Sequence, residues 1–309
     1  MGTLPRNLFC AAILILGVAS SAVADEAQGV KASTSFNFVL ATTRETKAKL
    51  IETVEIPLLV GNGALTSGNN LQIKAAAEIS PVSVNGTAEF RLTPIAFLQF
   101  VAGGSVGSGW NIPIANGLRK NERANAHDSE FTGGPLDGIV WSVRGGGLFQ
   151  FDLAAVMPGD WHHLVFQTYH EAKYRALTSA SSDDSWLYES DSGENRNGWN
   201  YYGNYFLGYQ MPIVLNTAGV LIEEDLYLFN TDGRSFWGDN LPRWTFGPLF
   251  NFTVTKNLLL AVLVQAHSMR NFTEETKDFT FYQNRQISDS NKLRIEFYRA
   301  ALNLTWKLK

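Results

Sequence analysis

The sequence contains two groups of residues of the types that form the catalytic sites of hydrolases. The first, from Gly103 to Gly107, matches the G-x-S-x-G pattern around a nucleophilic serine, here Ser105. That pattern forms a nucleophile site only where a strand turns sharply into a helix. Here it ends an alternating stretch and runs through residues 108–110 into a polar loop. We therefore interpret it as a flexible strand end.

The second group is His267, Ser268 and Asn271. Successive residues of a strand point to opposite faces, so His267 and Ser268 would not share a site. His162 and His163 follow a turn and have no third ligand at metal-binding spacing, so we expect them to form hydrogen bonds at an interface. The sequence thus predicts no catalytic residue, no cofactor and no metal site.

The remaining chemistry lies in ionisable residues on the polar faces of alternating segments. As a ring in a channel, such side chains would select solutes by charge. The other interpretation is that they pair across strands and fill a narrow polar lumen, because an unpaired buried charge is costly. Both interpretations give a hydrated interior without a preference for anions or cations. The lumen candidates are Lys74, Glu78, Glu89, Arg91, Arg144, Asp152, Glu171, Lys173, Arg175, Glu223 and Asp225.

The elements that must position these side chains are β-strands. In residues 139–153, Trp141, Val143, Phe149 and Phe151 alternate with polar residues, which is typical of a strand with one apolar face. Twelve segments can be read in this way, although ten or fourteen strands stay possible. They are 33–43, 47–59, 71–80, 86–93, 96–108, 139–153, 160–177, 199–210, 217–230, 244–254, 257–270 and 291–308.

The connections between these segments alternate between short and long. Outer-membrane barrels have short periplasmic turns and longer external loops, so this alternation predicts an orientation. Tight turns are expected at 93–95, 157–160 and 255–257, with an outer hairpin turn at Asn85-Gly86 and a long periplasmic connection at 60–70. The polar stretches 109–135, 178–198, 231–243 and 271–290 are expected to be external loops.

The longest of these loops, 109–135, is the leading candidate for a constriction that folds into the lumen. Its charged candidates are Arg119, Lys120, Arg123 and Asp128. If it narrows the lumen, its deletion should raise conductance.

Residues 1–24 are predicted to be a signal peptide cleaved near Ala24, which leaves residues 25–309 as the mature barrel. Arg6 precedes an apolar core that is too short to span a bilayer, and residues 22–24 are small. Cleavage would remove Cys10, the single cysteine, so disulfides in the mature chain are excluded. Cleavage would also remove Arg6, one of the 25 Lys and Arg residues, whereas the chain has 29 Asp and Glu residues. The mature chain would therefore be acidic, and it would offer no positively charged surface to nucleic acid.

Tryptophans near the ends of the expected strands favour a membrane barrel. Trp141, Trp161, Trp199, Trp244 and Trp306 occupy such positions, as in the aromatic girdles at membrane interfaces. A soluble β-sandwich or lipocalin-like barrel would also alternate, but its apolar face would point inward. We therefore expect an all-β fold, namely a single antiparallel transmembrane barrel of about twelve strands.

The last segment resembles the final strand of bacterial outer-membrane β-barrel proteins of the porin-like class. Tyr298, Leu302, Leu304, Trp306 and Leu308 alternate with polar residues, although the chain ends in Lys309 where that class commonly ends in Phe or Trp. The resemblance implies an integral outer-membrane protein that contacts membrane lipid and the barrel-insertion machinery. We expect a passive channel for small hydrophilic solutes. The alternatives are an adhesin or structural barrel that acts through its loops, and an outer-membrane lipid hydrolase.

Overall fold

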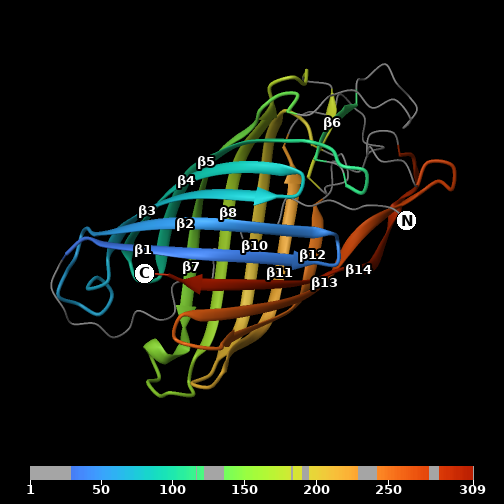
Figure 1. Ribbon diagram of the computed structural model, residues 1–309. Coiled ribbons are helices and arrows are strands. Elements are labelled where there is room, and N and C mark those ends of the chain that lie inside the picture. The colour runs from blue at the N-terminus through green and yellow to red at the C-terminus, as the bar shows by residue number, and fades with distance from the viewer. Residues whose placement is uncertain are drawn as a thin grey trace.

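Alternation along the chain produces twelve long antiparallel strands that close into one barrel (Figure 1). The computed structural model describes residues 29–115, 117–121, 136–181, 184–189, 195–228, 242–277 and 285–308. The barrel strands are β1 (Lys31–Ala41), β2 (Glu45–Pro57), β3 (Asn70–Ser80), β4 (Ser83–Ile95), β5 (Leu98–Gly109), β7 (Val140–Asp152), β8 (Leu164–Leu177), β10 (Gly198–Gln210), β11 (Leu215–Tyr227), β12 (Arg243–Thr253), β13 (Leu258–Phe272) and β14 (Ile287–Lys307). The predicted twelve-stranded barrel is confirmed.

The barrel closes because β14 pairs with β1 as well as with β13. Phe36 lies opposite Trp306 and Leu40 opposite Leu302 in the closing ladder. The strands define two ends. The terminal end holds the last strand's C-terminus and the connections 58–69, 96–97, 153–163, 211–214 and 254–257 (Figure 1). The opposite end, at which β1, β3, β5, β8, β11 and β13 end, is called the loop end. No helix among the described residues is long and apolar enough to cross a membrane.

Two of the predicted turns are wrong. Asn85-Gly86 lies inside β4, and the hairpin turn is instead formed by residues 81 and 82 between Ser80 and Ser83, whose hydroxyl oxygens lie 2.7 Å apart. Residues 93–95 end β4, and the turn follows at 96–97. The pairing of β4 with β5 becomes irregular at Pro94, because proline has no N–H to donate to the ladder. The strand nevertheless continues past Pro94 to Ile95.

The apolar residues of each strand point outward. Phe90, Phe100 and Leu207 are each about half exposed, at 50%, 51% and 55%. This arrangement is opposite to that of a soluble barrel, because an exposed apolar surface around the whole wall requires lipid rather than water.

The tryptophans lie on this outer surface or at its margins. At the loop end the Tyr174 ring lies 5.4 Å from the Trp141 ring and 5.5 Å from the Trp199 ring, across β7, β8 and β10. Trp244 is half-buried on β12, and Trp161 and Trp306 are exposed toward the terminal end. Their role at a membrane interface stays a prediction.

One residue of the last strand departs from the alternation. Tyr298 was expected to face outward with Leu302 and Leu304, but it is buried. The reason is a β-bulge, because Gln265 pairs with Arg299 and Ala266 with Phe297, which leaves Tyr298 without a partner in the ladder. The extra residue reverses the alternation from this point toward the loop end.

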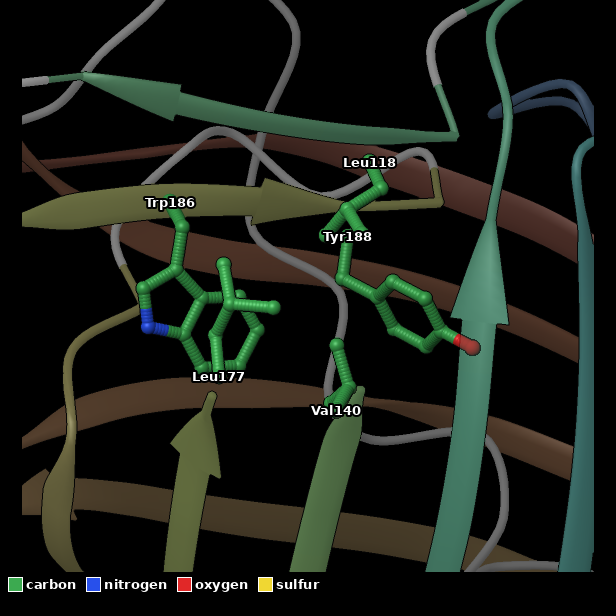
Figure 2. Close-up of a cluster of buried hydrophobic side chains, with 5 residues drawn as sticks. All are labelled: Leu118, Val140, Leu177, Trp186 and Tyr188. Atoms are coloured by element: carbon green, nitrogen blue, oxygen red, sulfur yellow. The ribbon is translucent and has the colours of Figure 1, made fainter. Parts of the chain in front are cut away.

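A small second sheet covers part of the loop end. The strands β6 (Leu118–Asn121) and β9 (Ser185–Tyr188) pair with each other and not with the barrel (Figure 1). In Figure 2 the side chains of Trp186 and Tyr188 extend from β9 toward Val140 and Leu177, at the ends of β7 and β8. Trp186 has no exposed surface. We call this two-stranded sheet, together with Glu189, the cap.

Candidate functional site

The candidate functional site is the barrel lumen, which is lined by the inward faces of the twelve barrel strands. A first network of charges crosses β4, β7 and β8. The Glu89 carboxylate accepts a hydrogen bond from Arg91 at 3.1 Å and from Arg144 at 2.6 Å, and the Arg144 Nε lies 3.6 Å from Glu171. Gly103 of β5 lies between Glu89 and Arg144 in the ladders, and its missing side chain lets Arg144 reach across that strand.

A second network joins β10, β11, β13 and β14. Glu223 is fully buried and accepts hydrogen bonds from the Tyr202 hydroxyl at 2.7 Å and from the Gln265 amide at 2.6 Å. The Gln265 oxygen accepts a hydrogen bond from Arg299 at 2.8 Å. The Arg299 guanidinium in turn lies 3.8 Å from Glu45. Arg299 is thus linked to Glu223 through Gln265 and lies beside Glu45.

A third network ties the cap to the barrel. The Glu189 carboxylate lies 2.5 Å from the Lys47 ammonium and accepts hydrogen bonds from Ser83 at 2.7 Å and Asn85 at 3.1 Å. The Lys47 ammonium also lies 3.2 Å from Glu78. A carboxylate from a connection at the loop end is thus inserted between interior residues of β2 and β4.

Tyr188 strengthens the attachment of the cap. Its hydroxyl donates a hydrogen bond of 2.7 Å to the Asn85 side-chain oxygen. Burial, together with the Glu189 carboxylate, raises the pKa of the Tyr188 phenol, which keeps this donor protonated. The Arg175 guanidinium lies 4.8 Å from the centre of the Trp186 ring, as in a cation–π contact.

The other predicted lumen residues lie at different heights. Lys74 and Lys173 are half-buried on the interior faces of β3 and β8, and Asp225 is buried on β11. Asp152 lies at the terminal end, where it accepts a hydrogen bond from the Ala154 N–H and lies 2.7 Å from His163. Asp152 is therefore part of the terminal rim and not of the central networks.

The predicted constriction loop contributes β6 to the cap. Arg119 lies opposite Leu187 in the β6–β9 ladder, and Lys120 donates a hydrogen bond of 3.0 Å to the Ser179 carbonyl. Arg123 and Asp128 lie outside the described residues. Glu189, which was not among the predicted lumen or constriction residues, is the cap residue whose carboxylate reaches Lys47 on the interior face of β2.

The sequence interpretation also missed Glu45, Lys47, Gln265 and Arg299. Two of these residues had a signal in the sequence. Arg299 lies on the polar face of the segment 291–308, and the alternation of the segment 257–270 puts Gln265 on the same face as His267. Glu45 lies just before the segment that was expected to begin at residue 47. A charged residue two positions before Lys47 on the same face was the available signal.

The lumen is not polar throughout. On the interior faces of β10 to β13, Phe206, Leu221, Leu249 and Leu263 pack into a buried cluster. By contrast, the interior residues Lys49, Thr53, Gln72 and Lys74 of β2 and β3 are half-buried and partly accessible. Solvent therefore reaches one wall of the lumen more readily than the opposite wall.

Neither hydrolase-like group forms a site in the lumen. Ser105 faces inward within β5, where its hydroxyl oxygen lies 2.7 Å from that of Ser142. His267 is buried and stacks on Tyr298, whereas Ser268 accepts a hydrogen bond from the Trp244 N–H on the other face. The expected separation of His267 and Ser268 onto opposite faces is confirmed.

An unexpected polar group lies on the outer surface. The Thr168 hydroxyl oxygen lies 2.8 Å from the Nε2 of His170, and the Tyr201 hydroxyl oxygen lies 2.6 Å from the Nδ1 of the same ring. The Tyr205 ring packs edge-on against the His170 ring, with the two ring centres 5.6 Å apart, and the Tyr205 hydroxyl donates a hydrogen bond of 3.4 Å to Glu224. These residues occupy outward positions of β8, β10 and β11.

The barrel is similar to several solved porin and transporter structures, whereas no protein-family model and no curated protein matches the chain. The KdgM porin has 10% sequence identity and a TM-score of 0.38, with coverage of 90% of this chain and 99% of that chain. The NanC porin has 7% identity, a TM-score of 0.42, and coverage of 89% and 100%. The toluene transporter TodX of Pseudomonas putida has 9% identity, a TM-score of 0.35, and coverage of 99% and 94%. The likeness is one of barrel architecture alone.

Proposed function

We propose that the chain is an integral outer-membrane protein that forms a passive channel for small hydrophilic solutes. The observation that carries the proposal is the partly accessible polar wall formed by β2 and β3 inside a closed barrel with an apolar outer surface. An aqueous path needs polar side chains along its length, because a solute that leaves bulk water must keep hydrogen-bond partners. Export through a cleaved signal at residues 1–24 accords with this location.

Solutes would enter at the terminal end along Glu55 and Gln72 and pass Lys74 toward Arg144. At the loop end they would meet the cap, which Glu189 holds against Lys47. Movement of the cap would therefore control access from that side. Because β6 is the partner strand of β9, deletion of the loop that contains β6 should also release the cap and raise conductance.

Solute flux into liposomes tests this proposal. The refolded full chain, shown to be a folded barrel by heat-dependent gel mobility, is inserted into liposomes that then receive an osmotic load of small neutral sugars. We expect swelling rates that fall as the sugar becomes larger. Swelling no faster than that of protein-free liposomes would contradict the channel.

The outer surface favours one second candidate, a lipid hydrolase. Thr168, His170 and Tyr201 place a hydroxyl, an imidazole and a second hydroxyl in hydrogen-bond contact, as a nucleophile, a base and a residue that orients the base would require. Phospholipid turnover in detergent that is lost in Thr168→Val and His170→Asn would support this activity. Turnover that both variants retain would remove this group as its source.

A further inference from the structure

The carboxylates in the middle of the lumen are buried and already bound by cations or hydrogen-bond donors. Glu78 lies beside Lys47, Glu89 beside Arg91 and Arg144, and Glu171 beside Arg144 and Tyr169. Glu223 is bound by Tyr202 and Gln265. None of these four carboxylates is more than 7% exposed. They contribute little free negative charge to a solute in the lumen.

Two lysines of the accessible wall, unlike these carboxylates, have no salt-bridge or side-chain hydrogen-bond partner among the described residues. Lys49 and Lys74 are half-buried on the interior faces of the neighbouring strands β2 and β3. Lys49 lies directly opposite Glu78 in the ladder, but the Glu78 carboxylate is bound by Lys47. Within the described part of the chain, no salt bridge or side-chain hydrogen bond joins Lys49 or Lys74 to another residue.

The surroundings of Lys74 are predominantly cationic. Lys74 lies directly opposite Glu89 in the ladder of β3 and β4, and the Glu89 carboxylate already binds Arg91 and Arg144. Across β5, Glu89 and Arg144 are both paired with Gly103, so Lys74 and Arg144 lie at the same height of the barrel. Lys49 lies on the same face of β2 as Thr53, the ladder partner of Lys74. The Arg144 side chain keeps 15% of its surface exposed. Three cations on β2, β3 and β7 thus face the same stretch of the lumen.

From this arrangement we propose that Lys49, Lys74 and Arg144 form a binding site for small anions that carry a carboxylate, and that the site makes the channel anion-selective. The inference rests on the proposed channel function. Excess positive charge in a narrow polar passage raises the local concentration of anions and excludes cations. The unpaired ammonium groups supply donors that a carboxylate can accept without displacing an existing salt bridge.

Two accessible carboxylates, Glu55 and Asp152, lie nearer the terminal end and have partners. Glu55 accepts a hydrogen bond of 3.0 Å from Gln72, and Asp152 lies beside His163. They face the entrance to the lumen, whereas Lys49 and Lys74 lie deeper. The cationic stretch is therefore the part of the path that an anion meets after the entrance.

Reversal potentials in a potassium chloride gradient across a planar bilayer test the site. For the wild-type chain we expect a chloride-to-potassium permeability ratio above unity, and citrate on one side should reduce the chloride current. The double variant Lys49→Gln with Lys74→Gln should lower the ratio and weaken the effect of citrate. The matched control is Lys256→Gln, which removes the same charge from the exposed turn between β12 and β13 and should leave both readouts unchanged.

The possible outcomes separate the two claims. Discrete openings with a ratio at or below unity, or a ratio that the double variant leaves unchanged, would overturn the anion site while the channel stands. A folded wild-type barrel that never conducts would overturn the proposed channel itself. Circular dichroism and heat-dependent gel mobility of the double variant establish that it is folded before its selectivity is interpreted.

Discussion

The Glu189 carboxylate, which follows β9 at the loop end, lies 2.5 Å from the Lys47 ammonium on the interior face of β2. The exposed fractions of the two side chains are only 9% and 11%. Removing one member of a buried pair leaves the other charge without compensation. This contact is therefore the point at which a small chemical change should release the cap.

Substitution of Glu189 should increase opening of the channel. In Glu189→Gln the side chain keeps its size but loses the charge that binds Lys47, so the cap should dissociate more often and the open probability should rise several-fold. Single-channel recording measures this directly. Glu274→Gln is a suitable control, because Glu274 is exposed in another connection at the same end. Equal open probabilities in wild type and Glu189→Gln would contradict the role of the cap.

Trp186→Ala should release the cap without unfolding the barrel. Trp186 is fully buried against Leu118, Val140 and Leu177, and removal of a buried tryptophan costs about 3–5 kcal/mol. We expect protease cleavage within residues 178–197 of the folded variant and unchanged heat-dependent gel mobility. A cap as resistant to protease as that of the wild type would show that this packing does not hold it.

Alkaline pH should weaken the attachment of the cap through Tyr188. The pKa of the Tyr188 phenol is raised above 10.0 while the cap is bound, mainly by burial, so the bound cap holds this proton more tightly than the released cap. The stabilisation is complete below about pH 10 and is lost as the pH rises above that value. Opening frequency should therefore rise above about pH 10 in wild type and rise less in Tyr188→Phe. Identical pH profiles for the two proteins would remove Tyr188 as the cause.

Arg299→Met should destabilise the barrel. Arg299 has no exposed surface, and its loss would leave Glu45 and Glu223 without this cation in the second network. Such a loss costs about 3–5 kcal/mol. Urea unfolding in lipid vesicles measures the change, with Arg294→Met at a half-exposed position of the same strand as control. Indistinguishable unfolding curves for the two variants would contradict the buried network.

Phe90→Arg tests whether the outer surface lies in lipid. Phe90 points outward from the middle of β4, where an arginine at the bilayer midplane costs about 2–4 kcal/mol. Leu293 is equally exposed, but it lies nearer the loop end than Ser268, which contacts Trp244 of the predicted interfacial girdle. Because a charge near the membrane interface costs less than one at the midplane, Leu293→Arg should cost about 1 kcal/mol or less. The difference in unfolding free energy between the two variants is the measurement. Equal costs would place both positions in the same environment.

The alternation in the sequence predicted about twelve strands and their two faces, because one face of each strand meets lipid and the other meets the lumen. The strand β7 shows this most clearly, since Val143 and Phe149 are exposed outward while Ser142 and Leu148 are buried. The alternation does not determine where the chain turns. Asn85-Gly86 has the composition of a hairpin turn, yet it continues a strand whose register is fixed by its neighbours.

The cap could not be predicted in the same way. Each of its strands has four residues, and all of β9 is buried, so no alternation marks it. Its position depends on Glu189 meeting Lys47, two residues that the sequence places in unrelated segments. The inward position of Tyr298 likewise depends on a bulge that arises from the pairing of β13 with β14.

The most direct test of the central claim is single-channel recording of the refolded full chain in a planar bilayer. Discrete openings that become more frequent in Glu189→Gln are expected, because the accessible wall of β2 and β3 provides the path and the cap controls it. A folded barrel that shows no openings, in wild type and in Glu189→Gln alike, would contradict the channel.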